Sequence, residues 1–187
     1  MSEGRAMRSC LILLGMLVLP ALVCASDISI ERAVAAVDNG IIVVDADAEL
    51  NFSADAIAAL ESGVRLVFTL DIRIRKPIRY FIDRTLFSTR HRYSLERHAL
   101  SDQYILTDLI TGDRRIQGSL AAAVDNLGRI RHVPVAERDA VDLPAESALR
   151  MRLRLDIESL PAPMIPIAYV SPGWYMSSGW FQWQAAL

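Results

Sequence analysis

The chain is poor in several residue types on which whole classes of function depend. Its 187 residues include two cysteines, three histidines and one lysine, Lys76. Both cysteines fall within residues 1–25, so the remainder has no thiol for a disulfide, a zinc site or covalent catalysis. The Gly-x-Ser-x-Gly motif of many serine hydrolases is also missing. The sequence therefore excludes a disulfide-stapled fold and the recognisable thiol and serine hydrolases.

Residues 1–25 have the pattern of a secretory signal peptide. Two arginines precede the apolar run Cys10–Val23, whose fourteen residues fall short of the roughly 20 that a membrane-spanning helix needs. We expect cleavage after Ala25 and export to the periplasm of a Gram-negative bacterium. An uncleaved anchor and lipidation of Cys24 are alternatives, although the valine before that cysteine departs from the lipoprotein pattern.

Residues 26–187 have the size and composition of a single β-rich domain. Period-two alternation of apolar and polar residues, the mark of half-buried strands, is clearest in Leu149–Ile157, Val44–Phe52 and Leu66–Arg75. Asn39-Gly40 is typical of a tight hairpin turn. The pattern predicts a mainly β fold, α+β at the margin. We expect an antiparallel β-sandwich or open barrel of about seven to eight strands.

Two or three short helices are expected to cover this fold. Ser53 can cap a helix over Ala54–Ser62, and Ser119 can cap one over Leu120–Leu127, each followed by a glycine. Residues 160–172 hold four of the eight prolines and predict an extended crossover that does not pair. The aromatic segment 173–184 follows, as a last strand or lid.

The stretch from Arg75 to His98 concentrates positive charge among aromatic residues. The apolar spacing of Ile78–Phe87 favours a short amphipathic helix or compact loop, either a structural cover over one end of the sandwich or a surface for an anionic lipid membrane or a membrane-protein partner. Nucleic acid is not expected in an exported protein. The candidate surface residues are Arg75, Lys76, Arg79, Tyr80, Phe81, Arg84, Phe87, Arg90 and Arg92.

Other candidate residues have both structural and functional interpretations. Three tryptophans, Trp174, Trp180 and Trp183, either fill the core or line a groove. The carboxylates of Asp45, Asp47 and Glu49 share one strand face, but side chains two residues apart are about 7 Å apart, too far to close on one ion. We expect them to form a charge ladder opposite Arg73 and Arg75 or opposite Arg150, Arg152 and Arg154. No metal or cofactor is predicted.

Three strings carry a resemblance to a known family. They are "LNFSADAIAALESGVRLVFTLDIRI", "RYSLERHALSDQYILTDLITGD" and "LPAPMIPIAYVSPGWYMSSGWFQW". Over Ile28 to Trp183 the chain resembles an uncharacterised proteobacterial envelope family, domain of unknown function 4390. The resemblance implies export, a single domain and a membrane sensor kinase as a partner, but no catalytic residues. The family is often tryptophan-rich where this chain has Tyr80 and Phe81.

These observations lead to three functional hypotheses. The first is a non-enzymatic, exported envelope protein that acts as a binding or accessory module through its basic-aromatic segment. The alternative is a carrier of lipid or a small hydrophobic ligand, with a cavity inside a β half-barrel. The third is an unrecognised hydrolase that uses His98 with Glu96.

Overall fold

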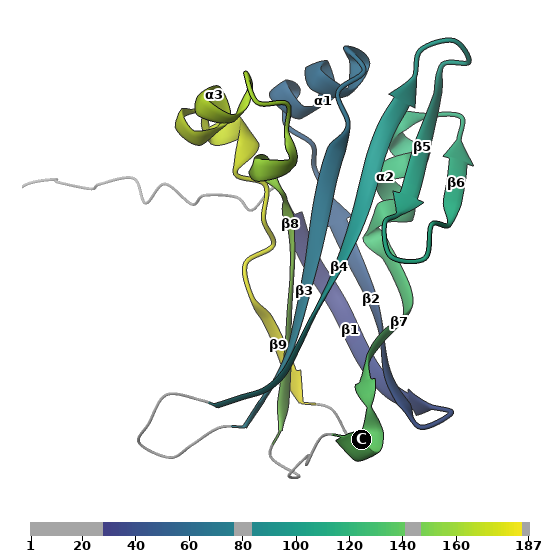
Figure 1. The fold of residues 1–187 in the computed structure, drawn as a ribbon, viewed down its shortest axis with the longest axis vertical. Helices are drawn as coiled ribbons and strands as arrows, with labels where there is room; N and C mark the ends of the chain where they lie inside the picture. The colour runs from purple at the N-terminus through teal and green to yellow at the C-terminus, as the bar shows by residue number, and fades with distance from the viewer. Residues whose placement is uncertain (1–27, 77–83, 141–146, 185–187) are drawn as a thin grey trace, which may run out of the picture.

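Nine strands form two antiparallel sheets in the computed structural model, which describes residues 28–76, 84–140 and 147–184 (Figure 1). The three-stranded sheet has the order β1-β2-β7, and the six-stranded sheet has the order β6-β5-β4-β3-β8-β9. Their bounds are β1 Ile28–Asp38, β2 Ile41–Leu50, β3 Leu66–Lys76, β4 Arg84–His98, β5 Gln103–Asp108, β6 Arg114–Gln117, β7 Arg129–Glu137, β8 Ala148–Leu155 and β9 Phe181–Gln184. The predicted mainly β, sandwich-like fold is confirmed.

The alternating strands place one side chain in two inside the sandwich. In β3 the inward residues Leu66, Phe68, Leu70, Ile72 and Ile74 are completely buried. In β8 the corresponding residues from Leu149 to Leu155 are at most 4% exposed. Because successive strand residues face opposite sides, this burial fixes the outward direction of the intervening charged residues. The core thus determines which side chains line the outer face of the six-stranded sheet.

The predicted hairpin and both predicted helix caps are confirmed. Asn39 and Gly40 have φ values of 48° and 80°, as a two-residue turn between β1 and β2 requires. The Ser53 hydroxyl accepts a hydrogen bond from the amide of Ala56 at the start of α1 (Ala54–Glu61). Ser119 accepts one from Ala122 at the start of α2 (Leu120–Gly128).

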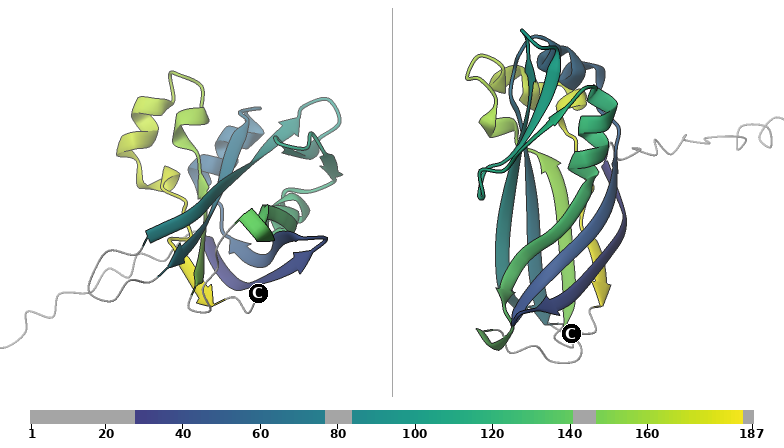
Figure 2. Two further views of the ribbon diagram at one scale, coloured as in Figure 1. Left: turned by 60° about the horizontal axis from the view of Figure 1, so that its bottom comes forward. Right: turned by 90° about the vertical axis from the view of Figure 1, so that its right-hand side faces the viewer.

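The helices cover the places where the sheets separate. Figure 1 shows α1 and α3 (Ile165–Val170) near one end of the sandwich, and α2 lies beside β5, β6 and β7. Figure 2 shows the same arrangement from two further directions. Three short 3₁₀ turns complete the elements: η1 Arg138–Ala140, η2 Ile157–Ser159 and η3 Pro172–Trp174. None of the described helices is long and apolar enough to cross a membrane.

The start of β4 corrects the short helix or compact loop expected over residues 78–87. Arg84 to Phe87 are strand residues, and the register with β3 pairs Lys76 with Arg84 and Ile74 with Phe87. Residues 78–83 lie outside the described part of the chain. Helical spacing is a local signal, and the long antiparallel ladder of β3 and β4 overrides it where the two strands meet.

The proline-rich crossover over residues 160–172 is also different from the prediction. It contains α3 and begins η3, so it is largely helical rather than extended. Pro166 lies in the first turn of α3. Backbone amides in the first turn have no partner within the helix, so the missing N–H of proline costs nothing there, and its fixed φ suits a helix. Ala168 of α3 and Trp174 of η3 join the core, so the segment covers the end of the sandwich.

Candidate functional site

Three neighbouring strands carry a row of arginines on the outer face of the six-stranded sheet. The register places Arg73 of β3 opposite Arg150 of β8, and Asp71 between Arg90 of β4 and Arg152 of β8. The next pair along, Arg92 and Arg154, flanks Thr69. We name this surface the arginine face; its members are Arg73, Arg90, Arg92, Arg150, Arg152 and Arg154.

Asp71 lies beneath the middle of the arginine face. It is only 3% exposed. Arg90 donates to its carboxylate over 2.8 Å and Arg152 over 3.1 Å, and Arg154 approaches to 3.5 Å. Burial would raise the pKa of Asp71, but the hydrogen bonds from Arg90 and Arg152 and the nearby positive charges outweigh it, so the pKa lies below its ordinary value. Asp71 therefore stays ionised and holds three guanidinium groups in place.

Trp180 contacts a second set of arginines on this face, which shares only Arg152 with the group around Asp71. The guanidinium carbons of Arg73 and Arg152 lie 4.5 and 4.6 Å from the centre of the indole ring, and that of Arg150 lies 5.6 Å away. A cation over an indole face is attracted by the ring's quadrupole. Trp180 is only partly buried, so the cluster of one indole and three guanidinium groups remains open to solvent.

The arginine face keeps a surplus of positive charge. Among the described residues, its six cations meet the carboxylates of Asp71 and of Asp156, which pairs with Arg92 over 3.4 Å. Neither Arg73 nor Arg150 has a carboxylate partner within the described ranges. In the same part of the chain, the Nε atoms of Arg150 and Arg152 and the hydroxyl of Thr69 are buried without hydrogen-bond partners. The face therefore carries positive charge that the carboxylates of the described fold do not balance.

The predicted basic-aromatic surface is divided by the structure. Arg90 and Arg92 belong to the arginine face. Arg75 lies half-buried at the end of the same row on β3, and Lys76 is exposed beside it. Phe87 is half-buried against the core, and Arg84 begins β4. The remaining predicted residues, Arg79, Tyr80 and Phe81, lie outside the described part of the chain.

The three tryptophans have different environments. Trp174 is 5% exposed within the core. Trp183 of β9 packs against the core and lies 6.0 Å from the ring of Phe181. Trp180 alone contacts the arginine face. The structural interpretation therefore holds for two of the three, and the surface interpretation is retained for Trp180.

The acidic strand face does form ion pairs, but with other partners than those predicted. Asp47 of β2 pairs with Arg131 of β7 and with Arg32 of β1, because these strands flank β2. The hydrogen bond from Arg131 outweighs desolvation and, with Arg32, holds the pKa of Asp47 below its ordinary value. Asp45 accepts a hydrogen bond from the backbone amide of His132. The predicted ladder opposite β3 or β8 is wrong because both of those strands belong to the other sheet.

The proposed hydrolase pair lies at the far end of β4. Nδ1 of His98 is 3.0 Å from the hydroxyl of Ser101, while Glu96 is engaged by Arg65 at 2.9 Å and Arg114 at 3.7 Å. No hydrogen bond joins these two described residues to each other. The arrangement is that of surface polar contacts and gives no support to an acid–base pair.

The sequence analysis did not identify Asp71 as a site residue, nor did it show that β3, β4 and β8 pair so that their arginines form one surface. The alternation places Asp71, Arg73, Arg90 and the arginines of β8 on outward faces. It does not show that β3 lies between β4 and β8, since strand order is a long-range property. One signal in the sequence could have pointed to this cluster. Asp71 is the only acidic residue on the outward face of β3, whose other charged residues are arginines.

A comparison with protein-family models matches residues 25–184 to the family described as Domain of unknown function (DUF4390). The chain belongs to the DUF4390 family. The match spans all nine described strands and the whole arginine face. It confirms the family that the sequence resembles, while export and the sensor-kinase partner stay predictions. No curated protein and no solved structure matches this DUF4390 chain.

Proposed function

We propose that this protein is a non-enzymatic, exported accessory module that binds an acidic face of a partner protein through the arginine face. The observation that carries the proposal is the positive surplus on β3, β4 and β8, held around Asp71 and Trp180. Guanidinium groups form paired hydrogen bonds with carboxylates, so a fixed array of them suits a fixed array of Asp and Glu residues.

A protein partner fits this geometry better than a lipid surface. Binding to membranes usually combines mobile cations with apolar side chains that enter the interface. On the arginine face several cations are anchored: Arg90, Arg152 and Arg154 lie against the carboxylate of Asp71, and the last two are only 28% and 30% exposed. The indole of Trp180 lies against Arg152. A membrane-protein partner with an acidic external segment satisfies both the charge and the rigidity.

The first test is direct binding of a synthetic peptide of alternating Asp and Glu, measured by calorimetry on the full-length protein. We expect the affinity to fall as salt is added, because exposed charges are screened. Arg73→Glu with Arg150→Glu should weaken binding at least about tenfold, a loss of about 1.4 kcal/mol. These two arginines are chosen because their reversal breaks no ion pair within the described ranges.

The control for net charge is Arg32→Glu with Arg138→Glu, which changes the net charge equally but lies on β1 and η1 and breaks only the exposed pair of Arg32 with Asp47. It should leave peptide affinity within about twofold. Equal losses in both double variants would mean that only net charge matters and would refute a defined site. Stronger binding to vesicles of anionic lipid than to the peptide, lost in the first variant, would transfer the surface to lipid and refute the protein partner.

A second test maps the surface in cells. A photocrosslinking residue at Ser88, which is exposed and lies opposite Arg73, should capture the partner. The same residue at Ala36, exposed on β1, should not. The captured protein must present an acidic segment at the crosslinked site. Crosslinks from Ala36 alone would place the partner on the other sheet and contradict the proposal.

A further inference from the structure

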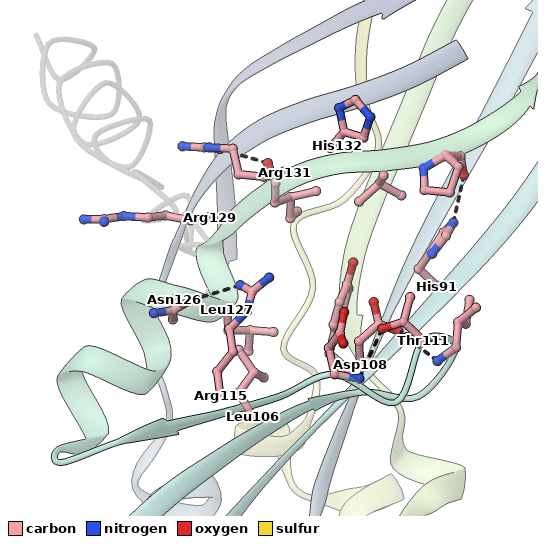
Figure 3. A pocket seen from close by; sticks show the side chains of 16 residues that line it. His91, Leu106, Asp108, Thr111, Arg115, Asn126, Leu127, Arg129, Arg131 and His132 are labelled. Atoms are coloured by element: carbon pink, nitrogen blue, oxygen red, sulfur yellow. Dashed lines mark hydrogen bonds between the residues drawn. The ribbon is translucent and has the colours of Figure 1, made fainter. Parts of the chain in front are cut away.

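A cavity of about 210 Å³ lies at the open edge between the two sheets (Figure 3). It is bounded by β7 on one side, by β4, β5 and β6 on the other and by α2. None of the six arginines of the arginine face lines it. An engineered cavity of roughly 150 Å³ holds a benzene molecule. This cavity is therefore large enough for a single substituted ring.

The deeper wall of the cavity is apolar. Leu106 of β5, Leu127 of α2, and Ile130 and Val133 of β7 line it, and each is at most 5% exposed. They come from both sheets and a helix, so their spacing is set by the core. Such a wall favours an apolar body over a chain of waters.

Most of the charged groups that line the cavity are engaged by other residues of the protein. Arg129 pairs with Asp125, Arg131 with Asp47, and His132 with Asp38; Arg115 donates to Asn126, and Asp108 accepts the amides of Ile110 and Thr111. Asp113 is exposed at the rim. A fully charged ligand would therefore lose hydration, and at depth it would meet charged groups that already have hydrogen-bond or ion-pair partners. The lining selects against ions.

Two polar groups of the lining, both on β4, form no ion pair with a described residue. Nε2 of His91 lies 3.0 Å from the carbonyl oxygen of Pro134, and a carbonyl can only accept (Figure 3). His91 must therefore donate through Nε2, so Nδ1 is the ring nitrogen left to accept a hydrogen bond. The hydroxyl of Tyr93 has no hydrogen-bond partner among the described residues. Burial is the main cause that raises the pKa of Tyr93 to about 12, so the hydroxyl remains a neutral donor.

We propose that this cavity binds a small, uncharged, amphipathic molecule, with a ring against Leu127, Ile130 and Val133 and one hydroxyl or amide group on Tyr93 and His91. This binding is independent of the arginine face. It gives the protein a second site, for a small molecule rather than a protein. The ligand class follows from an apolar wall, engaged charges and one hydrogen-bond donor beside one acceptor, Tyr93 and His91.

Three probes that share one ring test the charge selection. Benzyl alcohol, benzoate and benzylamine carry no charge, a negative charge and a positive charge near pH 7. Backbone amide shifts of the full-length protein are followed by NMR during each titration. Benzyl alcohol should produce saturable shifts in β7, α2 and the turn after β5, and the two ions should bind at least about tenfold more weakly. Absence of saturable shifts, or equal binding by either ion, would overturn the proposal.

A variant tests the hydrogen bond without relying on overall binding. Tyr93→Phe should weaken benzyl alcohol by about three- to tenfold and leave toluene, which has no hydroxyl, unchanged. Tyr104→Phe on β5 is the matched control, because Tyr104 is also half-buried but does not line the cavity. Equal loss for both ligands would show that Tyr93 only shapes the wall, and no loss would show that its hydroxyl is not used; either result contradicts the assignment.

Discussion

At the scale of single residues, Asp71 contacts three arginines, more than any other acidic residue that the structure describes. One carboxylate, nearly fully buried, accepts from two arginines and lies near a third. Removing it leaves three positive charges close together on neighbouring strands. The arginine face therefore depends on a residue that a partner would hardly touch.

Replacing Asp71 with Asn should destabilise the protein by about 1–3 kcal/mol at pH 7, since it breaks a buried ion pair whose cations are partly exposed. The pKa of Asp71 in the folded state lies below its ordinary value of 3.8. Its stabilisation is therefore fully present above that ordinary value and is lost as the pH falls through the lowered pKa. Urea unfolding at pH 7, 5 and 3 should show the two proteins converging at the acidic end.

The control for this measurement is Asp139→Asn, in the exposed turn η1. It should change the free energy of unfolding by no more than about 0.5 kcal/mol at any of these pH values. A difference between Asp71→Asn and the natural protein that stayed constant down to pH 3 would contradict the role of an ionised Asp71.

At the scale of elements, what could be predicted from the sequence was local. The faces of β3 and β8 follow from alternation, and the caps of α1 and α2 follow from Ser53 and Ser119. The predictions for the start of β4 and for α3 were wrong. Pairing with β3 determines the first, and packing against the core determines the second. The arginine face and the cavity join residues far apart in the chain, so they depend on strand order, which no local pattern contains.

Gly128 shows how tightly α2 is fitted to β2. A Cβ atom at Gly128 would lie 2.1 Å from the carbonyl oxygen of Ala48, and backbone cannot move aside cheaply. Gly128→Ala should therefore cost about 2–3 kcal/mol. Gly118, which has no atom within 4 Å of such a Cβ, is the matched control. Thermal and urea unfolding of both variants check this, and similar stabilities would contradict the close contact.

At the scale of the whole molecule, charges of opposite sign are separated in part, because some arginines pair locally with carboxylates, as Arg131 does with Asp47 and Arg129 with Asp125. The arginine face lies on β3, β4 and β8, whereas carboxylates gather around a hollow between β1, β2, α1 and α2. These carboxylates belong to Glu31, Asp47, Glu49 and Asp125. The formal net charge of −2 conceals this separation. Association with other molecules should therefore depend on orientation more than on net charge.

Ion-exchange chromatography checks the separation of charge. At pH 7 and low salt the protein should be retained on a cation exchanger despite its negative net charge, because the arginine face can adsorb to the resin while the acidic surface points away. Arg73→Glu with Arg150→Glu should abolish that retention, while Arg32→Glu with Arg138→Glu should keep most of it. If both variants elute alike, the separated face does not govern adsorption.

The fluorescence of Trp180 can report on the arginine face. Its indole is partly exposed among three guanidinium groups, whereas Trp174 is buried in the core. Small anions accumulate near clustered positive charge, at distances set by the ionic strength. Iodide is an anionic fluorescence quencher, so we expect it to quench Trp180 more strongly than an equally exposed indole in neutral surroundings. The neutral quencher acrylamide reports the exposure alone. The protein carries its own optical reporter of whether the face is free or covered.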